Sequence, residues 1–220
     1  MTMEGKADPV KPKRRYDSSR RQRQAVRTRE AILETARRLF LGRGYAGTTI
    51  ASIAEAADVS VETIYKAFGG KPGLVRAISE KVLEGVGPIP AEQRSDEMRT
   101  HETDPYSVME RWGMFTTEVA PLAAPIALLI RTAAATDPEM AGLLEELDQA
   151  RLVRMEHNAR QLLERGDFRE GVTLEHARDV LWAYSSPELY GMLVLRQRWP
   201  LEQYGQFVAD GMIAALLPPR

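Results

Sequence analysis

The stretch TTIASIAEAADVSVETIYKAFGGK, from Thr48 to Lys71, carries two short helical patterns separated by a break at residues 57–59. Each pattern is too short for a stable isolated helix, because helix nucleation is costly. Thr48 or Thr49 can cap the first helix, and Ser60 can cap the second. The stretch therefore predicts two short helices joined by a sharp turn, which is a helix-turn-helix.

The second of these helices is predicted to have one packed face and one exposed face. Ile64, Ala67 and Phe68 share a face at spacings of three and four residues, so we expect them to pack on the preceding helices. Asp58, in the turn, is expected to adopt a left-handed conformation. The exposed face carries Val61, Glu62, Thr63, Tyr65 and Lys66. The major groove of B-DNA accepts a helix of this size, so this face is predicted to probe DNA.

Charge is divided unevenly along the chain. Residues 1–84 carry 17 Lys and Arg against 10 Asp and Glu, a net of +7, and the total of -1 leaves -8 for residues 85–220. A basic front on an acidic body suits a protein that meets a polyanion at one end. We predict that residues 1–20 are a disordered basic arm, either a solvated tail or a phosphate-binding segment. Two roles are open for the arginines near the end of this arm: they enter the adjacent minor groove, or they only raise the local affinity for DNA. These arginines are Arg20, Arg21, Arg23 and Arg27.

Helical periodicity recurs throughout, and alternating strand patterns are absent, so the predicted fold is all-α. A DNA-binding domain is expected over 21–84, including a linking helix from Lys71, and a regulatory and dimerisation domain over 85–220. Residues 85–104 read as a loop. Prolines, among them Pro121 and Pro125, are taken as helix breaks or first-turn positions. Helices are expected over 21–41, 105–119, 123–135, 138–165, 173–186, 187–197 and 200–217.

Several classes of function find no support in the sequence. Cysteine is absent, which excludes disulfides and thiolate sites. We find no apolar run of transmembrane length and no apolar signal segment, and expect a cytoplasmic protein without a membrane partner. His101, His157 and His176 lack metal-ligand spacing, and no phosphate loop or nucleophile elbow is present. We therefore expect no metal, no cofactor and no enzymatic activity.

The stretch from Arg27 to Leu74 closely resembles the DNA-binding domain of the TetR/AcrR family of bacterial transcriptional regulators. The matching elements are Gly44-Tyr45, Thr48-Thr49-Ile50, Ile53-Ala54, Val59-Ser60, and the spaced residues Thr63, Tyr65, Phe68 and Lys71. Asp58 and Ala67 depart from the family pattern, which usually has glycine and often a bulkier residue there. The resemblance implies a three-helix DNA-binding domain, a homodimer held by the C-terminal domain, and a small ligand that changes the distance between the two DNA-binding heads.

The resemblance also implies roles for individual residues. Thr49, Tyr65 and Lys71 match positions that contact DNA phosphates, and Lys66 could reach a phosphate or a base. Glu62 either accepts a hydrogen bond from cytosine N4 or stabilises the first helical turn, and both readings stay open. Tyr65 could instead be a packed aromatic. The full candidate DNA-binding set is Thr48, Thr49, Ser60, Val61, Glu62, Thr63, Tyr65, Lys66 and Lys71.

A ligand site in the C-terminal half is less sharply indicated. Large aromatic and methionine side chains suit a largely apolar effector, but they also fill cores and dimer interfaces. Arg131 either holds a ligand carboxylate or bridges to a Glu. We place the cavity between the helices near 105–119 and 138–165. The candidates are Met109, Trp112, Phe115, Arg131, Met155 and Trp182, with Met114, His157 and Tyr190 as further possibilities.

The combined prediction is a sequence-specific DNA-binding regulator. We expect a ligand-responsive repressor that binds a palindromic operator as a homodimer. A helical protein-interaction adaptor and an enzyme without a recognisable motif are the alternatives. The expected dimer contributors, some of which must face the protomer's own core, are Leu181, Leu189, Leu193, Phe207, Ile213 and Leu216.

Overall fold

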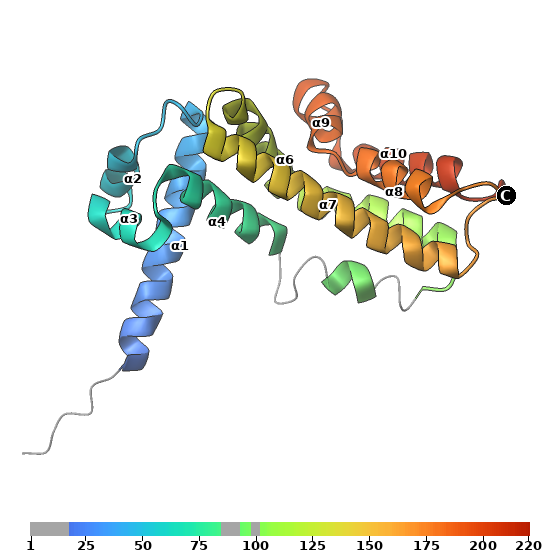
Figure 1. The fold of residues 1–220 in the computed structure, drawn as a ribbon, viewed down its shortest axis with the longest axis horizontal. Helices are drawn as coiled ribbons and strands as arrows, with labels where there is room; N and C mark the ends of the chain where they lie inside the picture. Colours follow the sequence, from blue (N-terminus) through green and yellow to red (C-terminus); the bar gives the residue numbers. More distant parts are fainter. Residues whose placement is uncertain (1–17, 85–92, 98–101) are drawn as a thin grey trace, which may run out of the picture.

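The computed structural model describes residues 18–84, 93–97 and 102–220, and over these ranges it is helical without strands (Figure 1). This confirms the all-α prediction. The N-terminal elements are α1 (Ser18–Arg43), α2 (Ile50–Ala56), α3 (Val61–Phe68) and α4 (Lys71–Glu84). Residues 93–97 form a short helix. The C-terminal elements are α6 (Pro105–Ala134), α7 (Pro138–Glu164), α8 (Leu174–Tyr184), α9 (Pro187–Tyr190), the π-helix η1 (Gly191–Arg196) and α10 (Leu201–Leu216).

Helices α1 to α3 form a small head at one end of the elongated molecule, and α4 leads from it toward the other helices (Figure 1). Phe40 of α1, Ile53 of α2 and Ile64 of α3 are fully buried at the centre of the head. Burial of such side chains stabilises the fold by roughly 1.5–3 kcal/mol each. The short helices α2 and α3 therefore owe their stability to this shared core.

Helix α4 connects the head to the body, which we define as α6 to α10. One apolar cluster includes Leu74 and Ile78 of α4 together with Ile126 and Ile130 of α6 and Met140 of α7. The head residues Phe40, Ile53 and Ile64 belong to the same cluster. The apolar core therefore crosses the predicted boundary between the two domains without interruption.

In the body, α6 and α7 run antiparallel, and α10 packs along α6 (Figure 1). A second apolar cluster holds this end together, and Trp112, Leu162, Tyr204 and Leu216 belong to it. The backbones of α6 and α10 come close at Gly113, where an added Cβ would lie 2.4 Å from the carbonyl oxygen of Gly205. A side chain at this position would push the two helices apart.

The prediction of a break between residues 119 and 123 is wrong, because α6 continues through Pro121 and Pro125. Each proline removes one backbone N–H from the helical ladder. Packing of α6 on α4, α7 and α10 offsets that loss. Tertiary contacts thus override a local signal that is usually reliable.

Three further boundaries differ from the prediction. Residues 187–197 form the four-residue α9 followed by a π-helical turn instead of a single α-helix. Helix α1 already begins at Ser18, inside the predicted arm, while residues 1–17 lie outside the described residues. Residues 93–97 are helical within the predicted loop, whose positions 85–92 and 98–101 also lie outside the described residues.

By length and apolar composition alone, α6 is the one helix within the described ranges that could cross a membrane. This corrects the expectation that no segment has such a composition. Core helices pass the same test, so one such helix is weak evidence for a membrane. Helix α6 contacts α4, α7 and α10, and 22% of its most apolar window is buried.

Candidate nucleic-acid interface and cavity

Side-chain caps define the turn between α2 and α3. Thr49 Oγ1 accepts a hydrogen bond from Ser52 N at 3.1 Å, and Ser52 Oγ accepts one from Thr49 N at 3.2 Å, which is a capping box. Ser60 Oγ accepts from Thr63 N at 3.1 Å and caps α3. Asp58 has a φ of 53°, as predicted. The sequence-predicted caps and the left-handed turn are therefore confirmed.

Thr48 differs from the other predicted DNA-binding residues. It is 0% exposed, and its hydroxyl is within 3.2 Å of the Leu39 carbonyl and 2.9 Å of the Gly44 carbonyl. A side chain in this position ties the loop to the end of α1 and cannot reach DNA. Thr49, and not Thr48, is therefore the N-cap of α2. The prediction that Thr48 contacts DNA is wrong.

The outward face of α3 is exposed along its length. Ile64 is buried and Phe68 half-buried, whereas Tyr65 is 53% exposed. Ala67, expected to pack with Ile64 and Phe68, is exposed instead. The hydroxyl groups of Thr63 and Ser60 are hydrogen-bonded to each other, with 2.8 Å between Oγ1 and Oγ. Both polar groups therefore lie at the start of the helix. The exposed residues of this face are Val61, Glu62, Thr63, Tyr65 and Lys66.

Arg29 fixes the far end of α3, a role that sequence reasoning missed. Its Nη1 donates to the Ala67 carbonyl at 3.2 Å, and its guanidinium lies 4.4 Å from the centroid of the Phe68 ring. From the sequence, Arg29 is only one of the basic residues within 1–84. Its spacing of 38 positions from Ala67 leaves no local signal for this contact. Arg21, Arg23 and Arg27 are exposed on α1, and the side chain of Arg20 lies outside the described residues.

Lys71 lies where the head meets the body. Its Nζ is 4.1 Å from the centroid of the Tyr45 ring, which in turn stacks on Phe40. Burial lowers the pKa of Lys71, with Asp137 acting in the opposite direction. Burial and a hydrogen bond to the Asp137 carboxyl raise the pKa of Tyr45. Asp137 also caps α7, where its Oδ1 accepts from Glu139 N at 3.0 Å. Tyr45 is therefore a half-buried link between head and body.

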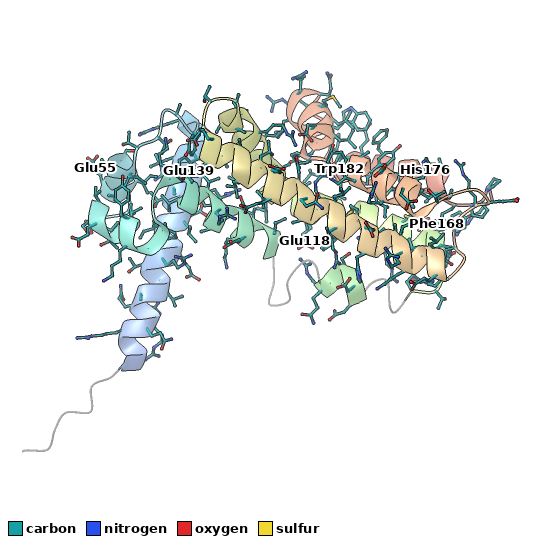
Figure 2. All side chains as sticks on the ribbon, in the orientation of Figure 1. Glu55, Glu118, Glu139, Phe168, His176 and Trp182 are labelled. Carbon is teal, nitrogen blue, oxygen red and sulfur yellow. The ribbon has the colours of Figure 1, made fainter. Side chains whose placement is uncertain are left out.

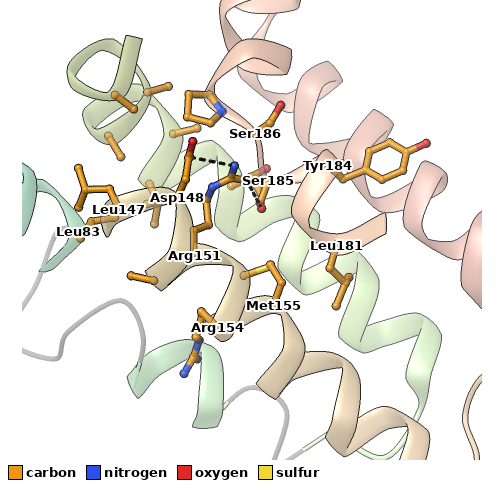
Figure 3. A pocket seen from close by; sticks show the side chains of 18 of the residues that line it. Leu83, Leu147, Asp148, Arg151, Arg154, Met155, Leu181, Tyr184, Ser185 and Ser186 are labelled. Carbon is orange, nitrogen blue, oxygen red and sulfur yellow. Dashed lines mark hydrogen bonds and ion pairs between the residues drawn. The ribbon is translucent and has the colours of Figure 1, made fainter. Parts of the chain in front are cut away.

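A cavity of about 310 Å³ lies in the body, between α4, α6, α7, α10 and the α8–α9 corner (Figure 3). Trp112, Phe115 and Met155 line it together, as predicted, and Arg131 joins them. Its walls are mainly apolar, and α4 contributes Ser79, Val82 and Leu83. Helix α4, which connects to the head, therefore forms part of the cavity wall.

The other predicted cavity residues lie elsewhere. Met109 is fully buried in the second apolar cluster, and Tyr190 packs edge-on against Tyr204 in that cluster. Trp182 lies beneath the guanidinium of Arg151, 4.4 Å from it. Met114 and His157 are exposed. Met109, Tyr190 and Trp182 therefore pack within the protomer, which was the alternative to lining the cavity. Met114 and His157 neither line the cavity nor lie in the protomer's core.

Charged residues at the cavity wall mostly have partners. Arg131 bonds to Asp148 at 2.9 Å and to Glu188, so it bridges to carboxylates. Arg154 points away from Arg151 toward residues 93–97, where it forms two bonds to Asp96 at 2.7 and 3.2 Å (Figure 3). Sequence reasoning missed Asp148, Arg151 and Arg154. Their separation of three residues on one helix was visible, but their orientation toward a cavity was not.

The short helix at 93–97 covers one side of the cavity. Arg94 makes two hydrogen bonds to Glu118 of α6, at 2.6 and 2.7 Å, and Asp96 is held by Arg154 of α7. Ser95, between them, is buried and lines the cavity. Two paired arginines thus hold this helix across the space between α6 and α7.

Within the described ranges, no group of three His, Asp or Glu side chains is arranged to hold a metal ion. Figure 2 shows His176 on α8, at the opposite end of the molecule from Glu55 on α2. The α3 face and the cavity wall each bring several polar side chains together.

Comparison with known proteins agrees with this arrangement. Residues 32–78 match the family model of bacterial regulatory proteins, tetR family. The HTH-type transcriptional regulator TtgR of Pseudomonas putida is 36% identical over 92 residues, which is 42% of each chain. The match thus spans less than half the length of this curated relative.

Solved structures extend the likeness to the whole fold. NalD, the secondary repressor of the MexAB-OprM multidrug efflux pump in Pseudomonas aeruginosa, superimposes with a TM-score of 0.70 at 21% identity, covering 89% of this chain and 100% of that one. SmeT in its complex with triclosan gives 0.69 at 23% identity, covering 87% and 92%. Residues 32–78 therefore match the DNA-binding segment of the tetR family of bacterial regulatory proteins, and the chain as a whole shares the helical fold of these solved structures.

Proposed function

We propose that this protein is a ligand-responsive transcriptional repressor that binds a palindromic operator as a homodimer. The single observation that carries the proposal is the exposed polar face of α3, whose opposite side is anchored by the buried Ile64. Val61, Glu62 and Thr63 lie at the start of α3, where recognition helices reach base edges. Tyr65, Lys66 and Thr49 flank them and would contact phosphates, which set position and orientation.

Lys71 completes the phosphate contacts in this proposal, although it is half-buried. Its ammonium rests on the Tyr45 ring, so its position is fixed before DNA arrives. A pre-positioned cation loses less conformational freedom when it binds a phosphate. Ser60 holds Thr63 at the start of α3 and would act through that contact.

The homodimer rests on the surface of the body around α8 to α10. Leu181 and Leu216 are buried in the protomer's own core, so they are not available to a partner. Leu189, Leu193 and Ile213 are partly buried, and Phe207 is exposed. Met192, Leu195 and Leu201 add exposed apolar surface nearby. In a two-fold dimer that uses this surface, the two heads would need to lie about 34–36 Å apart, or a multiple of one DNA turn.

The cavity would act as the switch. A ligand that fits one spacing of the heads better than the other shifts the population toward it. Because Ser79, Val82 and Leu83 of α4 line the cavity, a ligand there touches the helix that carries the head. Coupling of about 1–3 kcal/mol would weaken operator affinity roughly 5–150-fold. The complex of SmeT with triclosan shows that a protein of this fold holds a small molecule.

We further propose a cytoplasmic location, no membrane partner, no catalytic activity and no cofactor. The relatives are named regulators, which supports a binding function over an enzymatic one. A helical adaptor that binds another protein would not need the exposed face of α3 or the basic front. Binding to bare duplex DNA therefore separates the two functions.

The test is fluorescence anisotropy of the full chain on duplex DNA over a range of salt concentrations. Tyr65→Ala and Lys71→Ala should weaken binding to all sequences, and Lys71→Ala should lower the salt slope by about one unit. Glu80→Ala, on the exposed side of α4, is the matched control and should leave the slope unchanged. If wild-type protein binds no duplex at low salt, the proposed function is wrong.

A further inference from the structure

Two residues that line the cavity carry donors that have no hydrogen-bond partner in the protein. Its charged lining residues within the described chain are Arg131, Asp148, Arg151 and Arg154, which are three cations and one anion. Arg131 and Arg154 are paired with carboxylates, as described above. Of the described lining residues, Trp112 and Arg151 each bury a nitrogen without a hydrogen-bond partner in the protein. Both atoms are N–H donors, Trp112 Nε1 and Arg151 Nη2.

Arg151 is held firmly on one side only. Its Nη1 donates to Ser185 Oγ at 3.2 Å (Figure 3) and to the Trp182 carbonyl at 2.7 Å. Its guanidinium stacks on the Trp182 ring. Its Nη2 is 3.5 Å from Asp148 Oδ1. These contacts fix the guanidinium against the α8–α9 corner and leave Nη2 without a close acceptor.

The counter-charge near Arg151 is shared. Asp148 forms its shorter bond to Arg131, at 2.9 Å, and so serves two cations at once. Burial lowers the pKa of Arg151, the direction expected when a cation is only weakly compensated. An anionic oxygen near Nη2 would supply the acceptor that Asp148 provides only at a distance.

Trp112 carries the second such donor among the described lining residues. It is 6% exposed and comes from α6, whereas Arg151 comes from α7. Apolar side chains of α6 line the cavity, among them Phe115, Val119 and Ile126. A buried N–H without an acceptor destabilises the folded protein, so a ligand that supplies an acceptor gains affinity.

We infer that the cavity selects an apolar molecule that carries a carboxylate, with the carboxylate bound by Arg151 Nη2 and the Trp112 indole N–H available to a second acceptor. This rests on the proposed function in one respect, namely that the cavity is the effector site. It goes further in naming the ligand class. A cation of the same shape is disfavoured, because the two groups of the described lining residues that lack a hydrogen-bond partner, Arg151 Nη2 and Trp112 Nε1, are both donors.

The experiment uses matched triplets of apolar molecules on aliphatic and aryl scaffolds, each as carboxylate, primary carboxamide and ammonium. Binding to the full-length wild-type protein is measured by isothermal titration calorimetry at neutral pH. We expect the carboxylate to bind tightest in every triplet that binds, by about tenfold or more over the carboxamide, because charge-assisted hydrogen bonds are stronger. Equal affinities, a preference for ammonium, or binding by no triplet would overturn the inference.

Variants locate the effect. Arg151→Gln should bring carboxylate affinity down to that of the carboxamide. Asp148→Asn should raise carboxylate affinity several-fold by removing the competing negative charge. Trp112→Phe should weaken carboxylate and carboxamide alike by a few-fold. Arg160→Gln, on the same helix but paired with Glu156 on the surface, is the matched control and should change nothing. If Asp148→Asn weakens carboxylate binding, the assignment to Arg151 is wrong.

Arg151 also holds Trp182 and Ser185, so Arg151→Gln could lower stability, and its thermal unfolding is measured alongside. The wild-type ligand series does not depend on that variant. DNA release is followed separately, by adding the tightest carboxylate to the DNA complex. Carboxylate selectivity without release contradicts the proposed switch but keeps the ligand class. Release by ammonium and carboxylate alike contradicts the ligand class and keeps the switch.

Discussion

The head and the cavity differ in how their functional residues are distributed along the chain. The exposed α3 face and its caps lie within Thr48 to Lys71, and local helix geometry brings them together. The cavity wall draws on residues from Ser79 to Met212, on α4, the short helix at 93–97, and α6 to α10. A binding surface on one helix follows from periodicity, whereas a cavity between many helices depends on long-range packing.

The two regions are nevertheless joined by one apolar core, and a substitution in this core is expected to have the largest effect on stability. Ile126→Ala, in α6, should destabilise the protein by about 2–5 kcal/mol, because Ile126 is fully buried in the cluster shared with the head. Val153→Ala is the control, since Val153 is exposed on α7 and should change stability by about 0.5 kcal/mol at most.

The measurement is urea unfolding followed by two signals. Tryptophan fluorescence reports only the body, because all three tryptophans lie there, at 112, 182 and 199. Far-ultraviolet circular dichroism reports the whole chain. Coincident transitions in wild type and variant support a shared core, while an early transition confined to one signal would mean that head and body unfold separately.

The next largest effect on stability is expected where α6 and α10 approach closely, a contact that belongs to the body alone. Gly113→Ala should destabilise by about 1–3 kcal/mol, because its Cβ would lie 2.4 Å from the Gly205 carbonyl oxygen and 2.7 Å from the Ala209 Cβ. Gly142→Ala has open space on α7 and should stabilise by about 0.5–1 kcal/mol. Thermal unfolding decides this, and equal effects of the two substitutions would contradict the packing described.

Base recognition should respond only to changes in the head. Glu62→Ala and Thr63→Ala should each alter preference at a few base pairs, by about 1–3 kcal/mol where a direct base contact is lost. Competition binding with single-base operator variants measures this. Arg154→Gln in the body is the comparison and should leave base preference unchanged. A shift in base preference with Arg154→Gln would remove the distinction between the two regions.

The smallest expected effect lies at the contact between the regions. Tyr45→Phe removes a hydrogen bond to Asp137 worth about 0.5–1.5 kcal/mol and should reduce the effect of ligand on DNA affinity. Tyr65→Phe is the matched substitution on the exposed face and should weaken DNA binding without changing that coupling. Operator affinity with and without saturating ligand tests both. The reverse assignment of effects would contradict the role given to Tyr45.

The caps at Thr49 and Ser60 and the left-handed Asp58 could be predicted because each depends on neighbours within a few residues. Thr48 could not be separated from Thr49 by sequence, since both are polar and adjacent. What separates them is the contact of Thr48 with Leu39 and Gly44. The same holds for Arg29, whose partners Ala67 and Phe68 lie far along the chain.

In the body, Trp112, Phe115 and Met155 were predictable as cavity residues because their helices were expected to face one another. Met109 and Trp182 are also large and apolar, but Met109 lies in the core and Trp182 lies beneath the Arg151 guanidinium. The continuous α6 was missed because Pro121 and Pro125 are local signals, and packing on three helices outweighs them. Residue type indicates a cavity-lining candidate, but only packing decides which way it faces.

The most direct test of the central claim is selection of duplex DNA from a random pool by the full-length protein. The account predicts enrichment of a two-fold symmetric sequence, with base preferences that shift when Glu62→Ala and Thr63→Ala are introduced together. If no sequence is enriched over the starting pool, or if the double variant selects the same sequence as wild type, then α3 is not the recognition helix.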